Sequence, residues 1–279
     1  MDQLPPFFIP PTAHPHTHTA VFLHGRGGNV WALVRALRLW TNSDGHNLAR
    51  AFPTFRWVFP QAPMRTLAAA TAAAAATTSP ITATVSWPQW FDVWNGADFG
   101  DREGLQAEGL REQVPRLRGV LAAEAARLGG RWDRVVLAGI SMGGAAAAHV
   151  LFNLDVPPSG GGRLAALVGL ACRCPFAARS SSLADMRAAL ALEDGVPGGD
   201  AVVRGTPVLL EHCLDDELIT IEHGRRMCEI LTQFGAVVES REYPHGGHWF
   251  NAPQGANDAI AFLRKHVYNP DCNVVADDG

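Results

Sequence analysis

Gly139-Ile140-Ser141-Met142-Gly143-Gly144 is the stretch around which this chain is organised. The four residues before it, 135–138, form a short apolar run that favours a buried strand, and the four alanines at 145–148 favour a helix. A strand that turns directly into a helix needs glycine wherever a Cβ atom would collide with the backbone. The spacing G-x-S-x-G in this setting therefore predicts a sharp turn that exposes Ser141 beside the N-terminal end of a helix.

This arrangement is that of the nucleophile elbow, in which the serine attacks a carbonyl carbon. The same short motif also fits a glycine-rich turn whose serine only caps the following helix. The rest of the chain alternates apolar runs with helical patterns, which predicts an α/β-hydrolase fold with a doubly wound, mostly parallel sheet. Further strands are expected at 19–23, 55–60, 165–172, 208–212 and 236–243, and further helices at 30–51, 110–128, 222–234 and 256–267. Pro115 is expected to kink its helix or to mark a late start.

We expect a single domain over residues 19–267, preceded by an irregular, proline-rich arm at 1–18 and followed by a polar tail at 268–279. Two inserts are expected in this domain, an Ala/Thr-rich segment near 67–86 and a polar segment near 177–205 with one helix around 183–192. Alternating histidines without acidic or cysteine partners are typical of a solvated tail rather than a metal site. The arm contains three of them, His14, His16 and His18.

The composition excludes several classes of protein. The net charge of −4 and the pI near 6.2 give no sign of a nucleic-acid partner. Five cysteines without a C-x-x-C pair argue against a disulfide framework and a zinc site. No apolar run approaches the roughly 18 residues of a membrane span, and the first residues lack the basic and apolar regions of a signal peptide. We therefore expect a cytoplasmic protein, and the sequence makes no prediction of its oligomeric state.

A serine nucleophile requires a histidine base, an acid that orients the histidine, and N–H groups that hold the oxyanion. In the α/β-hydrolase fold, the acid and then the histidine follow the serine along the chain. The residue pattern alone leaves several candidates open. The acids after the strand that ends at His212 are Asp215, Asp216 and Glu217, and the histidines after the last strand are His245 and His248. The loop His24-Gly25-Arg26-Gly27-Gly28 fits an oxyanion loop, although alone it would be only a turn.

The chain resembles the phospholipase/carboxylesterase family, which contains the acyl-protein thioesterases. The motifs that carry the resemblance occur in the family's order between about residues 20 and 265: Phe22-Leu23-His24-Gly25-x-Gly27, Phe59-Pro60-x-Ala62-Pro63, Trp90-Phe91-Asp92, Gly139-x-Ser141-x-Gly143-Gly144, His212 with Asp216, and Tyr243 with His248. The resemblance implies Ser141, Asp216 and His248 as the catalytic residues. It implies the backbone N–H groups of Arg26 and Met142 as the oxyanion hole, and no metal or organic cofactor.

Three positions depart from the family pattern. Arg26 and Met142 stand where the family usually has a leucine-like residue and a glutamine, but both retain a backbone N–H group. Arg173 stands where the family usually has an apolar or aromatic residue near the acyl site. Two guanidinium groups at the rim of one pocket would favour a substrate that carries a carboxylate or phosphate. Alternatively, both side chains point to solvent or pair with Asp215, Asp216 or Glu217.

We therefore expect cleavage of a carboxylic ester or thioester through an acyl-enzyme. The expected partner is a small-molecule ester or another acylated substrate, and Trp90, Arg173 and His245 are further candidates to contact it. The aromatic cluster around Trp90 fits core packing equally well. One alternative function is an acyltransferase or a dedicated enzyme for one metabolite on the same fold. Another is a non-catalytic binding protein on a hydrolase scaffold.

Overall fold

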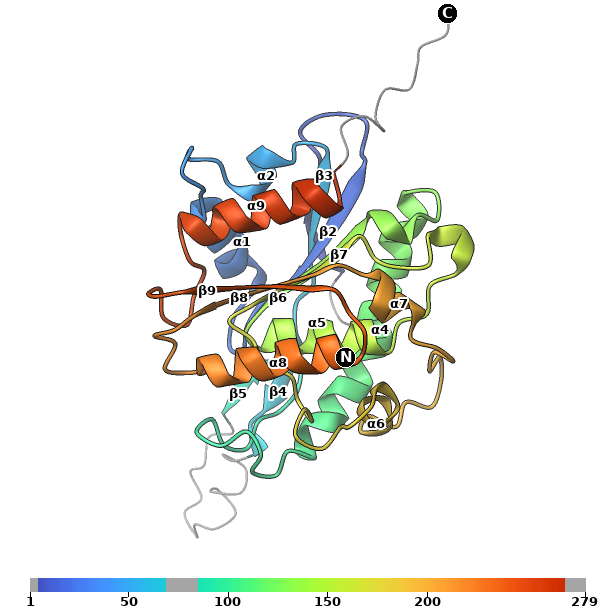
Figure 1. Cartoon of the computed structure of the whole chain (residues 1–279), viewed down its shortest axis with the longest axis vertical. Helices are drawn as coiled ribbons and strands as arrows, with labels where there is room; N and C mark the ends of the chain where they lie inside the picture. Colours follow the sequence, from blue (N-terminus) through green and yellow to red (C-terminus); the bar gives the residue numbers. More distant parts are fainter. Residues whose placement is uncertain (1–4, 69–84, 269–279) are drawn as a thin grey trace, which may run out of the picture.

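The computed structural model describes residues 5–68 and 85–268 (Figure 1). At its centre lies a seven-stranded sheet in the order β1-β3-β2-β6-β7-β8-β9. The strands from β3 to β9 in this order run parallel, and β1 at the edge runs antiparallel to β3. Their bounds are β1 (Phe7–Ile9), β2 (His18–Leu23), β3 (Phe55–Phe59), β6 (Val135–Ile140), β7 (Ala166–Leu170), β8 (Val208–Cys213) and β9 (Val238–Tyr243).

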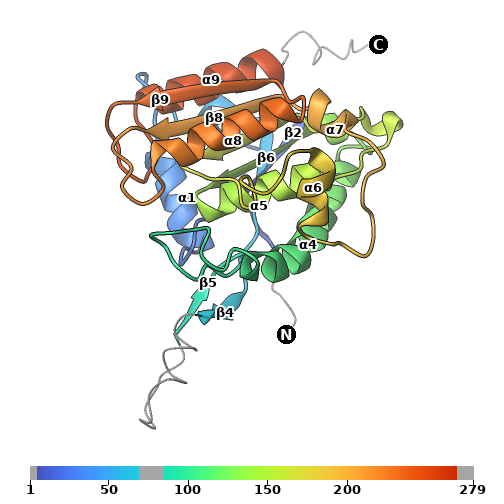
Figure 2. The same ribbon diagram turned by 60° about the horizontal axis from the view of Figure 1, so that its bottom comes forward.

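Helices cover both faces of this sheet, which gives the doubly wound α/β-hydrolase fold (Figures 1 and 2). One face carries α1 (Val30–Leu39), α2 (Leu48–Ala51) and α9 (Gln254–His266). The other carries α4 (Leu105–Arg127), α5 (Met142–Phe152) and α8 (Ile221–Gln233), with α6 (Leu183–Ala188) and α7 (Ala201–Gly205) against α5. A separate apolar cluster fills each side, as expected when both faces of a parallel sheet are buried.

Helix α5 packs closely against the centre of the sheet because residues 143–148 are all glycine or alanine. Every residue of α5 is buried, and the four alanines 145–148 are at most 1% exposed. A Cβ atom on Gly144 would collide with the side chain of Cys172, which follows β7. The small residues of the organising stretch therefore bring the start of α5 close to the carboxyl ends of β6 and β7.

The N-terminal stretch differs from the irregular arm expected at 1–18. Phe7–Ile9 pairs with β3 because its alternating side chains fit an edge strand. His18 begins β2 and is buried, and its ring stacks on Phe55 at 4.7 Å between centroids, so it is not part of a solvated tail. His16 bonds to the carbonyl of His18 and the hydroxyl of Thr19.

Several expected elements have different bounds. The expected helix at 30–51 is divided into α1 and α2, because Gly45 turns the chain at a φ of 73° and Asn47 caps the second helix. Helix α4 continues through Pro115, so the proline does not mark its start. The segment 177–205 contains two short helices, α6 and α7, where one was expected. Most of the expected insert at 67–86 lies outside the described residues, and it is flanked by the antiparallel pair β4 (Met64–Thr66) and β5 (Ser86–Pro88).

The described residues also bear on the expectations from composition. Within 5–68 and 85–268, no helix combines the length and the apolar character needed to cross a membrane. Four of the five cysteines lie in this part of the chain, and all four are free thiols: Cys172, Cys174, Cys213 and Cys228.

Candidate active site

Ser141 occupies the sharp turn between β6 and α5. Its φ of 56° and ψ of −125° place it in a region that residues other than glycine rarely adopt. A Cβ atom on Gly139 would overlap the backbone of Gly143, and a Cβ on Gly143 would overlap the carbonyl oxygens of Leu23 and His24. The two glycines thus permit the close packing that forces the turn, and the turn presents the hydroxyl of Ser141 at the carboxyl edge of the sheet.

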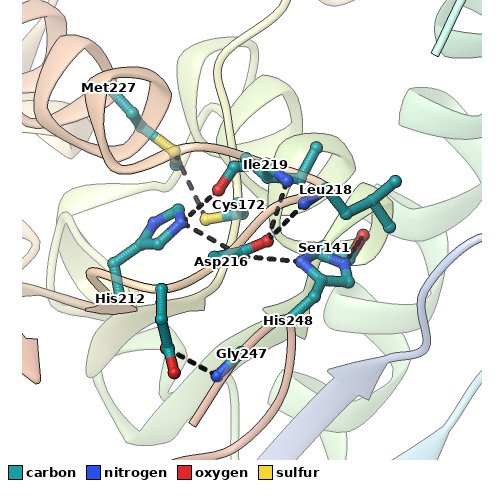
Figure 3. Close-up of polar contacts among 10 residues, drawn as sticks. Ser141, Cys172, His212, Asp216, Leu218, Ile219, Met227, Gly247 and His248 are labelled. Carbon is teal, nitrogen blue, oxygen red and sulfur yellow. Dashed lines mark hydrogen bonds and ion pairs between the residues drawn. The ribbon is translucent and has the colours of Figure 1, made fainter. Parts of the chain in front are cut away.

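His248 and Asp216 complete a hydrogen-bonded chain with this serine (Figure 3). Nε2 of His248 lies 2.9 Å from Oγ of Ser141, and Nδ1 of the same ring lies 2.8 Å from Oδ2 of Asp216. Because a carboxylate only accepts, Nδ1 carries the proton and Nε2 accepts the serine hydroxyl. The aspartate follows β8 and the histidine follows β9, so parallel strands bring the three side chains together at one edge.

The carboxyl group of Asp216 is fully buried and surrounded by donors. Its Oδ1 accepts the backbone N–H groups of Leu218 and Ile219, each at 2.9 Å, and its Oδ2 lies 3.2 Å from Nε2 of His212. Burial raises the pKa of this carboxyl, but the hydrogen bonds from His212, His248 and Ile219 more than offset that effect and hold the pKa well below its usual value. Asp216 is therefore ionised at neutral pH and fixed in one orientation.

Asp215 and His245 lie beside this chain but outside it. The carboxylate of Asp215 accepts the backbone N–H groups of Gly246 and Gly247, at 3.2 and 2.8 Å. His245 is 89% exposed at its side chain, and its nearest charged partner is Asp215 at 3.6 Å. Asp215 thus holds the loop that carries His248, whereas His245 is exposed and lines neither cavity beside Ser141.

Two backbone N–H groups next to Ser141 have no acceptor among the described residues. Within the described part of the chain, neither the N–H of Arg26 nor that of Met142 donates a hydrogen bond, whereas the neighbouring Gly27 donates to the carbonyl of Pro88. The loop that carries Arg26 passes close to the serine, since a Cβ built on Gly25 would lie 3.3 Å from Cβ of Ser141. Both free donors therefore border the space where an oxyanion would form during attack by Ser141.

Trp90 packs against the loop that carries Arg26 and lines neither cavity beside Ser141. Its indole is completely buried, and Nε1 donates to the carbonyl oxygen of His24 at 2.7 Å. The ring of His24 is held in turn, because its Nδ1 lies 2.8 Å from the carbonyl of Gly25 and its Nε2 accepts the N–H of Ala62. Trp90 is therefore a core residue, as one of the two interpretations of the aromatic cluster predicted.

Two cavities meet at Ser141. We call the first the Arg173 cavity; its volume is about 70 Å³, and its walls include Arg26, Phe91, Phe99, Met142, Arg173 and Leu218. We call the second the His248 cavity; its volume is about 170 Å³, and its walls include Gly25, Leu33, Ile140, Leu218, His248 and Trp249. A larger open groove of about 440 Å³ runs along α1 and shares Ala32 and Trp249 with the His248 cavity, but it does not reach Ser141.

The structure thus brings most of the expected site residues together and leaves two aside. Ser141, His248, Arg26, Met142 and Arg173 line the two cavities, and Asp216 is joined to them by its hydrogen bond to His248, whereas Trp90 and His245 do not line them. Leu218 lines both cavities and was not expected. Its position two residues after Asp216 is the signal that could have pointed to it. Phe99 lies in an irregular stretch with no periodic pattern that would reveal it.

The turn at Ser141, the chain of hydrogen bonds and the sheet topology define an α/β-hydrolase. More particularly, the chain belongs to the phospholipase/carboxylesterase family, whose model matches residues 5–267. It is 27% identical over 263 residues to acyl-protein thioesterase 1 of Gibberella zeae. The aligned region covers 92% of this chain and 94% of the relative. Its fold is similar to that of Zea mays acyl-protein thioesterase 2, with a TM-score of 0.65, 21% identity, and coverage of 94% and 99% of the two chains. Esterase PE8 is comparably similar, with a TM-score of 0.65, 20% identity, and coverage of 95% and 100%.

Proposed function

We propose that this protein is a serine hydrolase that cleaves a carboxylic ester or thioester through a covalent acyl-enzyme. The observation that carries the proposal is the hydrogen-bonded chain from Ser141 through His248 to Asp216, with the serine in a strained turn. Membership of the phospholipase/carboxylesterase family and the likeness to an acyl-protein thioesterase support the same class of bond.

The first half of the reaction acylates the serine. His248 takes the proton of Ser141 at Nε2 while Oγ attacks the carbonyl carbon, and Asp216 stabilises the imidazolium that forms. The tetrahedral intermediate then collapses, and the bond to the leaving group breaks. His248 gives its proton to the departing alcohol or thiol, which leaves an acyl ester on Ser141.

The second half uses water in place of the alcohol or thiol. His248 takes a proton from a water molecule, the water oxygen attacks the acyl carbon, and the carboxylic acid departs as Ser141 regains its proton. In both halves the N–H groups of Arg26 and Met142 hold the oxyanion. Each such donor contributes roughly 3–4 kcal/mol to transition-state stabilisation in comparable enzymes. The scheme requires no cofactor.

The proposed substrates are small-molecule esters or other acylated compounds. The walls of the His248 cavity are largely apolar, which suits an apolar group on one side of the scissile bond. A cytoplasmic location stays a prediction from the sequence.

Hydrolysis of 4-nitrophenyl butanoate tests the proposal. We expect the unmodified protein to release 4-nitrophenol, and Ser141→Ala to lower kcat by on the order of 10⁴-fold or more with an unchanged circular dichroism spectrum. Ser159→Ala is the matched control, because Ser159 is exposed in the turn Pro158–Gly160, beyond the end of α5 opposite Ser141, and it is expected to retain full activity. Equal rates for the Ser141→Ala variant and the unmodified protein would rule out the proposed nucleophile.

A further inference from the structure

The two cavities at Ser141 differ in which reacting group borders them. His248, which must protonate the leaving group, borders the His248 cavity and not the Arg173 cavity. Met142, whose N–H faces the oxyanion, borders only the Arg173 cavity. Because the leaving group must stay within reach of Nε2 of His248, it occupies the cavity that this residue lines. The acyl chain consequently enters the Arg173 cavity.

Arg173 brings a positive charge into that cavity, and no described residue lining the cavity carries a negative one. The residue is only 6% exposed, and its one hydrogen bond to a described residue goes from NH2 to the neutral amide oxygen of Gln106 at 2.6 Å. In the described part of the chain it forms no ion pair. The negative charge of Glu103 influences Arg173, but the oxygens of Glu103 bond to the N–H of Phe176 and to Arg179. Burial lowers the pKa of Arg173 to about 10, partly offset by the charge of Glu103, so the group remains charged at neutral pH.

Arg26 places a second guanidinium group at the same cavity, and its hydrogen bonds also go to neutral oxygens. Its Nε donates to the side-chain oxygen of Gln89 at 2.9 Å, and its NH2 donates to the carbonyl of Val93 at 3.3 Å. Asp92 influences it electrostatically, but the oxygens of Asp92 accept N–H groups from Ala68, Gln89 and Val93. Arg26 therefore also forms no ion pair with a described residue.

Apart from Ser141, the remaining walls of the Arg173 cavity are apolar or aromatic and include no acid among the described residues. The guanidinium of Arg173 lies over the ring of Phe99 at 4.0 Å, which holds it in place without neutralising it. A buried, unpaired cation is costly to a folded protein, so such a group is normally kept for a ligand that completes the pair. A cavity of about 70 Å³ has room for only a short chain.

We propose that Arg173, together with Arg26, forms an anion subsite for the acyl group, and that the preferred substrates are esters or thioesters of short dicarboxylic acids. The far carboxylate of such an acyl chain would pair with a guanidinium group at the end of the Arg173 cavity, while its near carbonyl is attacked by Ser141. This inference rests on the proposed function, since it assigns the acyl side of the same reaction.

Matched methyl esters test the preference. The monomethyl esters of succinic, glutaric and adipic acid are compared with the methyl esters of butanoic, pentanoic and hexanoic acid, with proton release followed at constant pH. We expect kcat/KM to be between about 10-fold and 100-fold higher for the best carboxylate ester than for its neutral counterpart. The cationic methyl 4-aminobutanoate is expected to be the poorest substrate. Equal values for the carboxylate and neutral esters would overturn the proposal.

Three variants test whether the arginines of the Arg173 cavity cause the preference for carboxylate esters. Arg173→Met removes the unpaired charge with similar bulk, and Arg26→Met removes the second guanidinium while keeping the backbone N–H. We expect the ratio of kcat/KM between carboxylate and neutral esters to approach one in Arg173→Met and to fall in Arg26→Met. Arg225→Met is the control, because Arg225 is an exposed arginine already paired with Glu242, and its ratio is expected to match that of the unmodified protein. An undiminished ratio in both cavity variants would overturn the assignment.

A binding measurement separates this proposal from the proposed hydrolase activity. Calorimetric titration of Ser141→Ala with glutarate, and in parallel with inorganic phosphate, does not depend on turnover. We expect glutarate to bind more tightly than phosphate, and the added change Arg173→Met to abolish its binding. Glutarate binding without hydrolysis of any ester would leave the subsite standing and remove the hydrolase proposal. Hydrolysis of neutral esters without glutarate binding, or tighter binding of phosphate, would remove the carboxylate subsite.

Discussion

Oδ2 of Asp216 lies 2.8 Å from Nδ1 of His248, whereas the carboxylate of the preceding residue is turned away toward backbone N–H groups. Two adjacent aspartates thus have separate roles: Asp216 fixes the imidazole ring, and Asp215 fixes the loop behind it. The division arises because successive side chains after β8 point in different directions.

Exchange of either aspartate for asparagine separates these two roles. In Asp216→Asn the amide no longer stabilises the imidazolium and favours the wrong tautomer of His248, so we expect kcat to fall by on the order of 10⁴-fold. In Asp215→Asn the remaining oxygen still accepts an N–H from the loop, so we expect a change of less than about 10-fold. Steady-state kinetics with a 4-nitrophenyl ester measures both. A larger loss for Asp215→Asn would transfer the orienting role to that residue.

The support of the oxyanion loop by Trp90 predicts a defect in catalysis from a residue that lines no cavity. Trp90→Phe deletes the donor to the carbonyl of His24 and leaves space beneath the loop. We expect kcat to fall about 10-fold, and the free energy of unfolding to fall by about 2–3 kcal/mol. Trp31→Phe is the control, because Trp31 is 68% exposed, and it should change neither quantity appreciably. An unaltered kcat in Trp90→Phe would show that the loop does not need this support.

Two glycines of helix α4 are expected to respond in opposite ways to alanine. A Cβ on Gly109 would lie 2.5 Å from Cα of Phe91, so Gly109→Ala must push α4 away from a wall of the Arg173 cavity. A Cβ on Gly119 would meet nothing within 4 Å. We expect Gly109→Ala to lower the free energy of unfolding by about 2–3 kcal/mol and Gly119→Ala to raise it by up to about 1 kcal/mol. Urea denaturation measures both, and a stable Gly109→Ala protein would contradict the packing of α4 on Phe91.

Buried His18 is expected to make the protein sensitive to mild acid. Burial, with a smaller contribution from the charge of Arg134, lowers the pKa of His18 from 6.5 to about 4. The unfolded chain therefore binds a proton on this residue between those two values while the folded chain does not, and stability falls as the pH falls from about 6.5 to about 4. The loss due to His18 amounts to about 2 kcal/mol at pH 5.

Replacement of His18 by phenylalanine should remove the part of the acid-induced loss of stability that His18 causes. Unfolding midpoints in urea at pH 7.5 and pH 5 are expected to differ less in His18→Phe than in the unmodified protein. His14→Phe changes an exposed histidine of the same segment and should leave the difference as it was. An equal loss of stability on acidification in His18→Phe and the unmodified protein would show that other groups cause it.

The sequence is most informative where one local pattern dictates the backbone. The apolar run at 135–138, the glycines on either side of Ser141 and the four alanines leave little choice but a strand, a tight turn and a closely packed helix. The small edge strand at Phe7–Ile9 escaped prediction because three residues between prolines carry almost no periodic signal. Its pairing with β3 is a tertiary contact.

At the site, the sequence pattern did not predict the direction in which each side chain points. Asp215 and Asp216 are chemically identical neighbours, and only the course of the chain after β8 decides which one meets His248. Trp90 belongs to a cluster of aromatic residues that suits a core and a pocket wall equally, and its contact with the carbonyl of His24 spans 66 positions of the chain. The burial of Arg173 without an ion pair likewise depends on which acids surround it in space.

Trapping of the acyl-enzyme tests whether Ser141 is the nucleophile. The protein is mixed with excess 4-nitrophenyl butanoate, quenched in acid within the first turnover, digested and examined by mass spectrometry. We expect a burst of 4-nitrophenol and a butanoyl group on the peptide that contains Ser141, and we expect neither in Ser141→Ala or in His248→Ala. Steady hydrolysis with no acylated peptide, or a butanoyl group on another residue that persists in Ser141→Ala, would contradict it.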